Sequence, residues 1–280
     1  MRTTTIVILA LFGASRAWCG ELAYSRLTDG FWQLWVYDED RGHIQVTEGS
    51  SDKRRPRWIG TTGLLYRTND GELHKVELGS PSQPLLPAVW PALDPTWSPS
   101  SRSVAFARLR TDLRDASIVV IAGSGSAPLR VLPLEPGFYA EPSWSPDGTW
   151  LAVVRVRGYE GADILRVAVE GRGEEILVSG KAQNTSPVVA PEGTQIAYAS
   201  NTTGDFEIWT STLEGEVKQL TRSPGFDGSP AYRPDSSRIT FVTQRRGPLE
   251  IWEMGPEGQD AAPLFTIDSD VADPAWKPAP

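Results

Sequence analysis

One short element recurs six times along this chain, and it constrains the fold more than any other feature of the sequence. The element reads proline, any residue, aromatic residue, with valine in place of the aromatic residue in the fourth copy. The six copies are Pro56–Trp58, Pro95–Trp97, Pro142–Trp144, Pro187–Val189, Pro230–Tyr232 and Pro274–Trp276. Their first prolines are separated by 39, 47, 45, 43 and 44 residues. Such a period indicates a repeat architecture in which each copy is one supersecondary unit.

Short apolar segments follow each copy of the element. The third copy, for example, is followed by LAVVR from Leu151 and DILRVAV from Asp163. Segments of this length, rich in β-branched and aromatic residues and bounded by turn formers, predict β-strands. No segment shows a sustained helical period. Four strands in about 45 residues is the period of one propeller blade. The prediction is therefore an all-β, six-bladed β-propeller built from four-stranded antiparallel blades.

The two ends of the chain predict how the ring closes. Residues 273–278 read as an innermost strand with no blade after it, and residues 21–47 supply three strands with no innermost strand before them. Together they complete one blade, which removes the exposed edges that an open sheet would have. We therefore expect residues 21–280 to form one six-bladed domain, with an open solenoid of six units as the alternative.

Residues 1–20 are predicted to be a secretory signal peptide. They hold the basic residue Arg2, an unbroken apolar run of seven residues from Ile6 to Phe12, and small residues after it. This run is too short to span a bilayer, which needs about 20 residues. The alternatives are a buried N-terminal strand and lipidation at Cys19, which the bulky Trp18 disfavours. We therefore expect a protein that is periplasmic or otherwise exported and does not span the membrane.

Composition narrows the classes of function. The 280 residues include 27 Lys and Arg and 35 Asp and Glu, for a net charge of −8. This acidic balance, with no basic run, argues against nucleic-acid binding. Two histidines, His43 and His74, and one cysteine leave little for a metal centre or for thiol chemistry. No Gly-x-Ser-x-Gly motif occurs. The sequence therefore predicts that the protein is not an enzyme and has no catalytic residues and no metal site.

The residue before each proline of the repeat is predicted to line one mouth of the central channel. An acidic ring there could bind a basic partner segment or calcium. No dense Asp-x-Asp-x-Asp-Gly loop supports calcium, so the prediction is no cofactor, with calcium in the channel as the alternative. Solvated carboxylates that cap turns are the other interpretation. The charged residues at or near this mouth are Arg55, Asp94, Glu141, Asp227, Asp270 and Asp273.

Four aromatic residues lie close to the same mouth in the sequence, within segments rich in proline and glycine. Exposed aromatic residues beside charged ones are typical of the hot spots of protein interfaces. The alternative is packing between blades, because large aromatic side chains dominate cores. The predicted partner-binding set is therefore Arg55, Trp90, Asp94, Phe138, Tyr139, Glu141, Phe226, Asp227, Asp270 and Asp273.

The sequence of the repeat resembles that of TolB-type propellers. The resemblance rests on Pro-Ser-Trp-Ser-Pro-Asp-Gly at 142–148, on apolar–aromatic pairs such as Ile208-Trp209, and on endings such as Leu220-Thr221. It covers residues 21–280. The resemblance implies six blades and an exported docking platform for a peptidoglycan-associated lipoprotein of the outer membrane. TolB proteins also carry an α/β domain before the propeller, and we expect that domain to be absent here.

These observations predict an exported, non-enzymatic, TolB-like propeller that binds a protein partner at the mouth of its channel. The resemblance makes a peptidoglycan-associated lipoprotein, or another protein of the cell envelope, the first candidate for that partner. The alternative is a carbohydrate-binding or glycan-acting propeller that uses the mouth carboxylates, because paired acids can carry out glycoside chemistry. A structural protein without a discrete site is a third interpretation.

Overall fold

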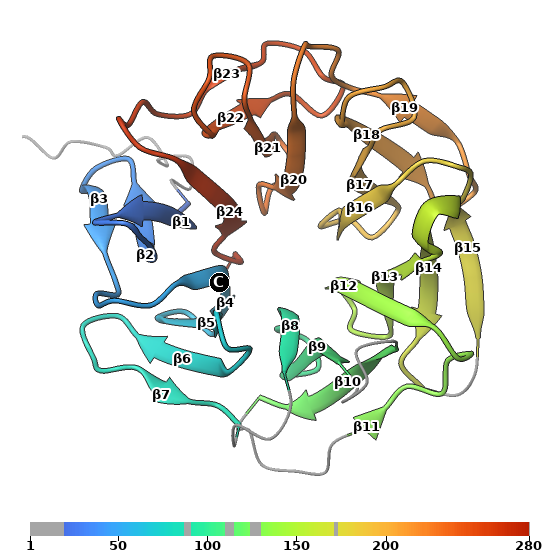
Figure 1. Ribbon diagram of the computed structural model, residues 1–280, viewed down its shortest axis with the longest axis horizontal. Helices are drawn as coiled ribbons and strands as arrows, with labels where there is room; N and C mark the ends of the chain where they lie inside the picture. The colour runs from blue at the N-terminus through green and yellow to red at the C-terminus, as the bar shows by residue number, and fades with distance from the viewer. Residues whose placement is uncertain (1–19, 87–90, 110–114, 124–129, 171–172, 280) are drawn as a thin grey trace, which may run out of the picture.

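The chain forms a ring of β-sheets around a central channel (Figure 1). The computed structural model describes residues 20–86, 91–109, 115–123, 130–170 and 173–279. Residues 1–19, which hold nearly all of the predicted signal peptide, and Trp90 of the predicted binding set lie outside this part. Within it, the secondary structure consists of 24 strands and one short 3₁₀ helix, η1 (Gly158–Glu160). No helix in these ranges is long and apolar enough to cross a membrane.

Each blade contains four antiparallel strands, and the prediction of an all-β propeller is confirmed. The innermost strands are β4 (Lys53–Ile59), β8 (Ala92–Ser98), β12 (Phe138–Trp144), β16 (Asn184–Val189), β20 (Asp227–Tyr232) and β24 (Val271–Trp276). The second strands are β5 (Gly63–Thr68), β9 (Ser103–Leu109), β13 (Trp150–Val156), β17 (Gln195–Ser200), β21 (Ile239–Thr243) and β1 (Leu22–Thr28). The third strands are β6 (Leu73–Glu77), β10 (Ala116–Ala122), β14 (Ala162–Ala168), β18 (Glu207–Thr212), β22 (Glu250–Met254) and β2 (Phe31–Asp38). The outermost strands are β7 (Gln83–Pro84), β11 (Arg130–Val131), β15 (Glu174–Val178), β19 (Val217–Gln219), β23 (Ala262–Pro263) and β3 (Gly42–Gln45).

The sheet order groups these strands into blades. Four blades are separate four-stranded sheets, and the strands from β8 to β15 form one eight-stranded sheet. The larger sheet consists of two blades that share a single parallel pair, Ala116 with Phe138. In the part of the chain that the structure describes, the strand order therefore gives six groups of four strands.

The first and last strands of the ring pair with each other. β1 and β24 run antiparallel, with Leu22 opposite Trp276 and Arg26 opposite Val271. The Lys277 amide also donates to the Glu21 carbonyl oxygen at 2.9 Å. One blade is therefore built from both ends of the described chain, in the order β24-β1-β2-β3. This pairing closes the ring and leaves no unpaired inner strand at the seam.

Apolar side chains fill the spaces between neighbouring blades. One such cluster joins Leu65 of β5 to Val104 and Phe106 of β9, all at most 1% exposed. Another joins Leu22 and Tyr24 of β1 to Val242 of the preceding blade. Burying one such side chain stabilises the fold by about 1.5–3 kcal/mol. The ring therefore holds the inner strands, and the residues they carry, in fixed positions around the channel.

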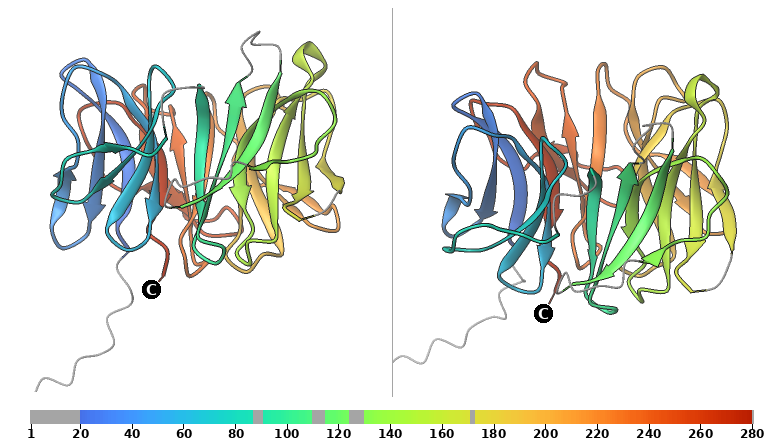
Figure 2. Two further views of the ribbon diagram at one scale, coloured as in Figure 1. Left: turned by 90° about the horizontal axis from the view of Figure 1, so that it is seen from below. Right: turned by 60° about the horizontal axis from the view of Figure 1, so that its bottom comes forward.

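The two faces of the ring carry different loops. The lower face in the left panel of Figure 2 carries the C-terminus, while η1 lies on the opposite, upper face. The inner strands run from the upper face to the lower one, so the loops that lead into them lie on the upper face together with the turns between second and third strands. The inner strands, which carry the predicted mouth residues, therefore start at the upper face.

Candidate functional site

The residue before each repeat proline has an unusual backbone. In all six inner strands its φ angle is positive, between 49° and 58°. The strand pairing skips this residue and the following proline, for example Ser229 and Pro230 of β20. Proline has no N–H to donate to the ladder, and it disfavours the right-handed helical region for the residue before it. The missing N–H explains why the ladder is interrupted at the proline, and the same left-handed bulge recurs in every blade. The six left-handed residues are Arg55, Asp94, Glu141, Ser186, Ser229 and Asp273.

Three of these left-handed residues have their backbone N–H bound by a carboxylate of a neighbouring blade. The Arg55 amide donates to Asp273 Oδ2 at 3.2 Å, and the Glu141 amide donates to Asp94 Oδ2 at 3.4 Å. The Ser186 amide donates to Glu141 Oε2 at 2.5 Å. In each case the carboxylate belongs to the left-handed residue one blade earlier in the ring. Three of the six amides at these bulges therefore have a carboxylate as their partner.

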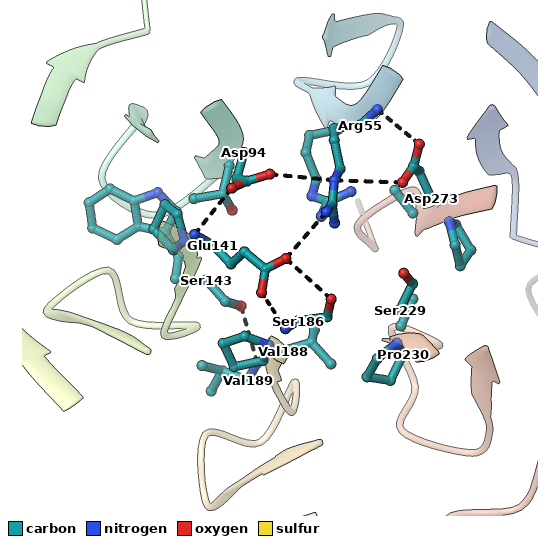
Figure 3. A pocket seen from close by; sticks show the side chains of 18 of the residues that line it. Arg55, Asp94, Glu141, Ser143, Ser186, Val188, Val189, Ser229, Pro230 and Asp273 are labelled. Carbon is teal, nitrogen blue, oxygen red and sulfur yellow. Dashed lines mark hydrogen bonds and ion pairs between the residues drawn. The ribbon is translucent and has the colours of Figure 1, made fainter. Parts of the chain in front are cut away.

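The guanidinium group of Arg55 lies among the three carboxylates of this ring (Figure 3). Its Nε atom lies 3.4 Å from Asp94 Oδ1 and 3.6 Å from Asp273 Oδ1, and its Nη2 atom lies 3.2 Å from Glu141 Oε1. Arg54 Nε adds a 2.7 Å contact to Asp273 Oδ2. The expected acidic ring is therefore an ion-paired cluster, because an arginine from one blade reaches the carboxylates of three others.

Burial and ion pairing have opposite effects on Asp273. Its side chain is only 3% exposed, and burial alone would raise the pKa of its carboxyl group. Arg55 and Arg54 outweigh that effect and hold the pKa well below its usual range. Burial alone would also lower the pKa of Arg55, but Asp94, Asp273 and Glu141 together raise it. Arg55 and Asp273 are therefore both charged at neutral pH.

A cavity of about 220 Å³ occupies the channel next to this cluster. Residues of all six repeat elements line it, including Arg57, Ser143, Ser186 and Ser229. In Figure 3 the Arg55 cluster fills one side, while Ser186 and Ser229 lie on the other. Arg57 Nη1 donates to the carbonyl oxygen of Pro56 at 2.9 Å. The channel is therefore asymmetric, with ion pairs on one side and short hydroxyl side chains on the other.

The other two predicted acidic residues lie outside this cluster. Asp227 is fully buried and forms an ion pair with Arg245 at 2.6 Å. Asp270 accepts a hydrogen bond from the Leu249 amide at 2.8 Å. Both carboxylates therefore organise upper-face loops, and the structure brings only Asp94, Glu141 and Asp273 together with Arg55.

The predicted aromatic residues have different environments. Tyr139 is 1% exposed and packs in the core between blades, and burial raises the pKa of its hydroxyl group. Its neighbour Phe138 is half-buried, because adjacent residues of a strand point to opposite faces. Phe226 is also half-buried and packs on Phe206, with ring centroids 6.0 Å apart. Of the described aromatic residues in the predicted set, Phe138 and Phe226 alone retain accessible surface for a partner.

Among the residues that the structure describes, the most exposed aromatic one was not in the predicted set. Tyr159 lies in η1 on the upper face and is fully exposed. It follows Val156, which is 37% exposed and lies opposite Phe138 in the strand pairing. The sequence signal that could have identified Tyr159 is its position between two glycines, Gly158 and Gly161, which favour a tight turn.

Metal binding and glycoside chemistry both need carboxylates that are not already paired. Among the described residues, no group of three His, Cys, Asp or Glu side chains could hold a metal ion. The three channel carboxylates face Arg55 instead of an open cleft. This arrangement does not provide the separate acid and base that glycosidases use.

Comparison with known proteins gives a consistent family match. The profile described as the TolB beta propeller domain matches residues 90–280. An uncharacterized protein of Agrobacterium fabrum (strain C58 / ATCC 33970) is 24% identical over 173 residues, which is 60% of this chain and 58% of that protein. The match therefore spans less than two thirds of that relative's length.

Solved structures share the fold over most of the chain. A protein from Agrobacterium tumefaciens described as a TolB superimposes with a TM-score of 0.74 and 20% identity, covering 90% of each chain. TolB from Acinetobacter baumannii gives a TM-score of 0.79 and 18% identity, covering 93% of this chain and 67% of that one. At these identities the likeness establishes the propeller fold.

Other structures of this fold correct the prediction that the chain is not an enzyme. A puromycin-hydrolyzing peptidase of Mycobacterium tuberculosis gives a TM-score of 0.63 at 18% identity, over 90% of this chain and 46% of its own. An oligogalacturonate lyase of Vibrio parahaemolyticus gives 0.63 at 13% identity, over 89% and 75%. The exclusion of enzymes was wrong because one scaffold supports several functions, and activity depends on the residues placed on it. A missing catalytic motif therefore does not exclude catalysis here.

Proposed function

Because the chain belongs to the TolB β-propeller domain family, we propose that it is an exported protein-interaction propeller of the cell envelope, which docks a partner protein on its upper face beside the channel mouth. A preformed face on a closed ring can bind with little rearrangement, because its loops are held by strands that pack against one another. The proposed partner is a peptidoglycan-associated lipoprotein or another envelope protein, a proposal supported by the family resemblance.

The observation that carries this proposal is an apolar patch on the upper face. The patch consists of Phe138, Val156 and Tyr159, which lie close together at the top of one blade. Tyr159 is fully exposed, and Val156 is 37% exposed. Large exposed aromatic residues are costly to leave in water, and they are the residues that most often dominate binding energy at interfaces. Tyr159 is therefore the proposed anchor for the partner.

The export part of the proposal is supported by the sequence of residues 1–20, with its apolar run from Ile6 to Phe12. We expect a fusion of these residues to alkaline phosphatase to be active in the periplasm. Cytoplasmic retention of the fusion would contradict export without affecting the docking proposal.

Docking is tested by calorimetry with the purified peptidoglycan-associated lipoprotein of the source organism. We expect Tyr159→Ala to weaken binding about tenfold or more, the effect of losing one interface hot spot. Val217→Ser is the matched control, because Val217 is 52% exposed on the outermost strand β19, away from the patch. Equal binding by wild type and Tyr159→Ala would place the interface elsewhere. If wild type does not bind at all, this lipoprotein is not the partner.

A further inference from the structure

One rule describes which amides of the channel ring are bound. An amide of a left-handed residue is bound where the left-handed residue one blade earlier carries a carboxylate, as Asp273, Asp94 and Glu141 do. Ser186 and Ser229 occupy two of the remaining positions, and their side chains carry no carboxylate. The amides that follow them in the ring are those of Ser229 and Asp273. These two neighbouring amides therefore lack the partner that the same geometry provides elsewhere.

The side chains around these two amides are available for binding. The Ser229 hydroxyl forms no hydrogen bond within the described residues, and Figure 3 shows it facing the space beside the Arg55 cluster. The Ser186 hydroxyl lies at 3.5 Å from Glu141 Oε1, the long limit of a hydrogen bond. Both serines line the cavity of about 220 Å³. This open arc of the channel, formed by Ser186, Ser229 and the amide of Asp273, thus presents several hydrogen-bond donors and no carboxylate of its own.

Arg57 supplies the charge that an anion would need. Its side chain lines the same cavity, and within the described residues it forms no ion pair with a carboxylate. Burial and the nearby charge of Arg55 lower the pKa of Arg57, and the three channel carboxylates offset that effect only in part. The cations Arg54, Arg55 and Arg57 equal the three channel carboxylates in number. One added monovalent anion is therefore not opposed by an excess of negative charge.

We propose that the open arc binds a carboxylate group that the docked partner inserts into the channel, as an acidic side chain or as its chain terminus. The incoming oxygen accepts from the amides of Ser229 and Asp273 and from the Ser229 hydroxyl, with Arg57 as the counter-ion. Hydrogen bonds to an ionised acceptor are the strong ones. The choice of a carboxylate as the ligand rests on the structure, because three amides of the same ring already bind carboxylates. That the carboxylate comes from a docked partner rests on the proposed function.

The test uses NMR of the ¹⁵N-labelled protein, with acetate as the probe and chloride as the ionic-strength control. We expect saturable shifts of the Ser229 and Asp273 amide signals at acetate concentrations up to about 100 mM, and no comparable shifts for the bound amides of Arg55, Glu141 and Ser186. Ser229→Asp places a carboxylate in the arc itself and is expected to weaken acetate binding at least about tenfold. Ser80→Asp adds the same charge at an exposed position outside the channel and is the matched control.

Several results would overturn this inference. They are the absence of saturable shifts, equal shifts at the bound amides, and acetate binding by Ser229→Asp that equals wild type. The source of the carboxylate is tested by adding the purified lipoprotein, which should reverse the acetate shifts by competition. Simultaneous binding of both would overturn the partner as the source. Acetate binding without any partner binding contradicts the proposed function alone, and partner binding without acetate binding contradicts this inference alone.

Discussion

The two sides of the channel have the same backbone and opposite chemistry. On both sides the residue before the repeat proline is left-handed, with φ between 49° and 58°. On one side Arg55 meets three carboxylates, which in turn bind backbone amides. On the other side Ser186 and Ser229 leave two amides without a carboxylate. The proline repeat sets the geometry of the ring, and the single residue before each proline determines whether that part of the channel is filled by ion pairs or left open.

The largest difference between the two sides should appear on removing Arg55. Arg55→Ala leaves three carboxylates close together and leaves the buried Asp273 with Arg54 alone. Breaking a buried ion pair from one side costs about 3 kcal/mol, and we expect the free energy of unfolding in urea to fall by about that amount. Ser229→Ala, which removes a side chain on the open side, is the matched control. A loss of less than about 1 kcal/mol for Arg55→Ala would mean that the cluster is solvated like surface ion pairs.

The same comparison predicts a pH dependence. Arg55 and Arg54 lower the pKa of Asp273 in the folded protein below the ordinary value of 3.8. The resulting stabilisation is fully present above pH 3.8 and is lost as pH falls through the folded-state pKa, because the unfolded chain binds the proton more readily. We expect the urea midpoint of wild type to decline below about pH 4, and Asp273→Asn to decline less steeply. Parallel pH profiles for the two proteins would show that Asp273 is not the group responsible.

Glu141 connects the two sides and should have an intermediate effect. Its carboxylate pairs with Arg55 and also accepts from the Ser186 amide. Glu141→Gln keeps an acceptor for that amide but removes the charge, so we expect a loss of about 1–2 kcal/mol in urea unfolding. Glu141→Ala removes both contacts and should cost more. If the two variants are equally stable, the amide contact contributes nothing measurable.

The sequence predicted the fold well because the repeat is a local signal. Each Pro-x-aromatic element lies in its own inner strand, and the end segments around Leu22 and Trp276 pair as expected. The site was predicted less completely. The ion pairs of Arg55 join residues from four blades, so the sequence of a single repeat cannot predict them.

Two aromatic residues illustrate the other limit. Tyr139 is buried and Phe138 is half-buried, because a shift of one residue along a strand exchanges the faces. Sequence spacing placed both near the mouth but could not tell which one faces solvent. Tyr159 was missed because its exposure depends on the shape of a single turn, Gly158–Glu160. The fold therefore follows from periodicity, whereas the site depends on side-chain direction and on contacts between blades.

A single substitution should make the open side of the channel resemble the ion-paired side. Ser229→Asp should place a carboxylate next to the Asp273 amide, as Asp94 does for the Glu141 amide. Aspartate tolerates the left-handed conformation that Ser229 has. We therefore expect a gain of about 1 kcal/mol in the free energy of unfolding at pH 7, and a gain that shrinks at low pH as the new carboxyl group becomes protonated. Destabilisation at pH 7 would mean that repulsion from the neighbouring carboxylates outweighs the new hydrogen bond to the Asp273 amide.

The smallest effect should come from the open side itself. Ser229→Ala removes a hydroxyl that has no hydrogen-bond partner within the described residues. Such a change should alter stability by no more than about 0.5 kcal/mol, the ordinary range for substitutions that break no contact. The same variant should nevertheless weaken acetate binding a few-fold, since one donor to the bound carboxylate is lost. If stability is unchanged but acetate binding is weaker, the Ser229 hydroxyl contributes to ligand binding. A clear loss of stability would instead show that this hydroxyl supports the fold, as the carboxylates on the Arg55 side do.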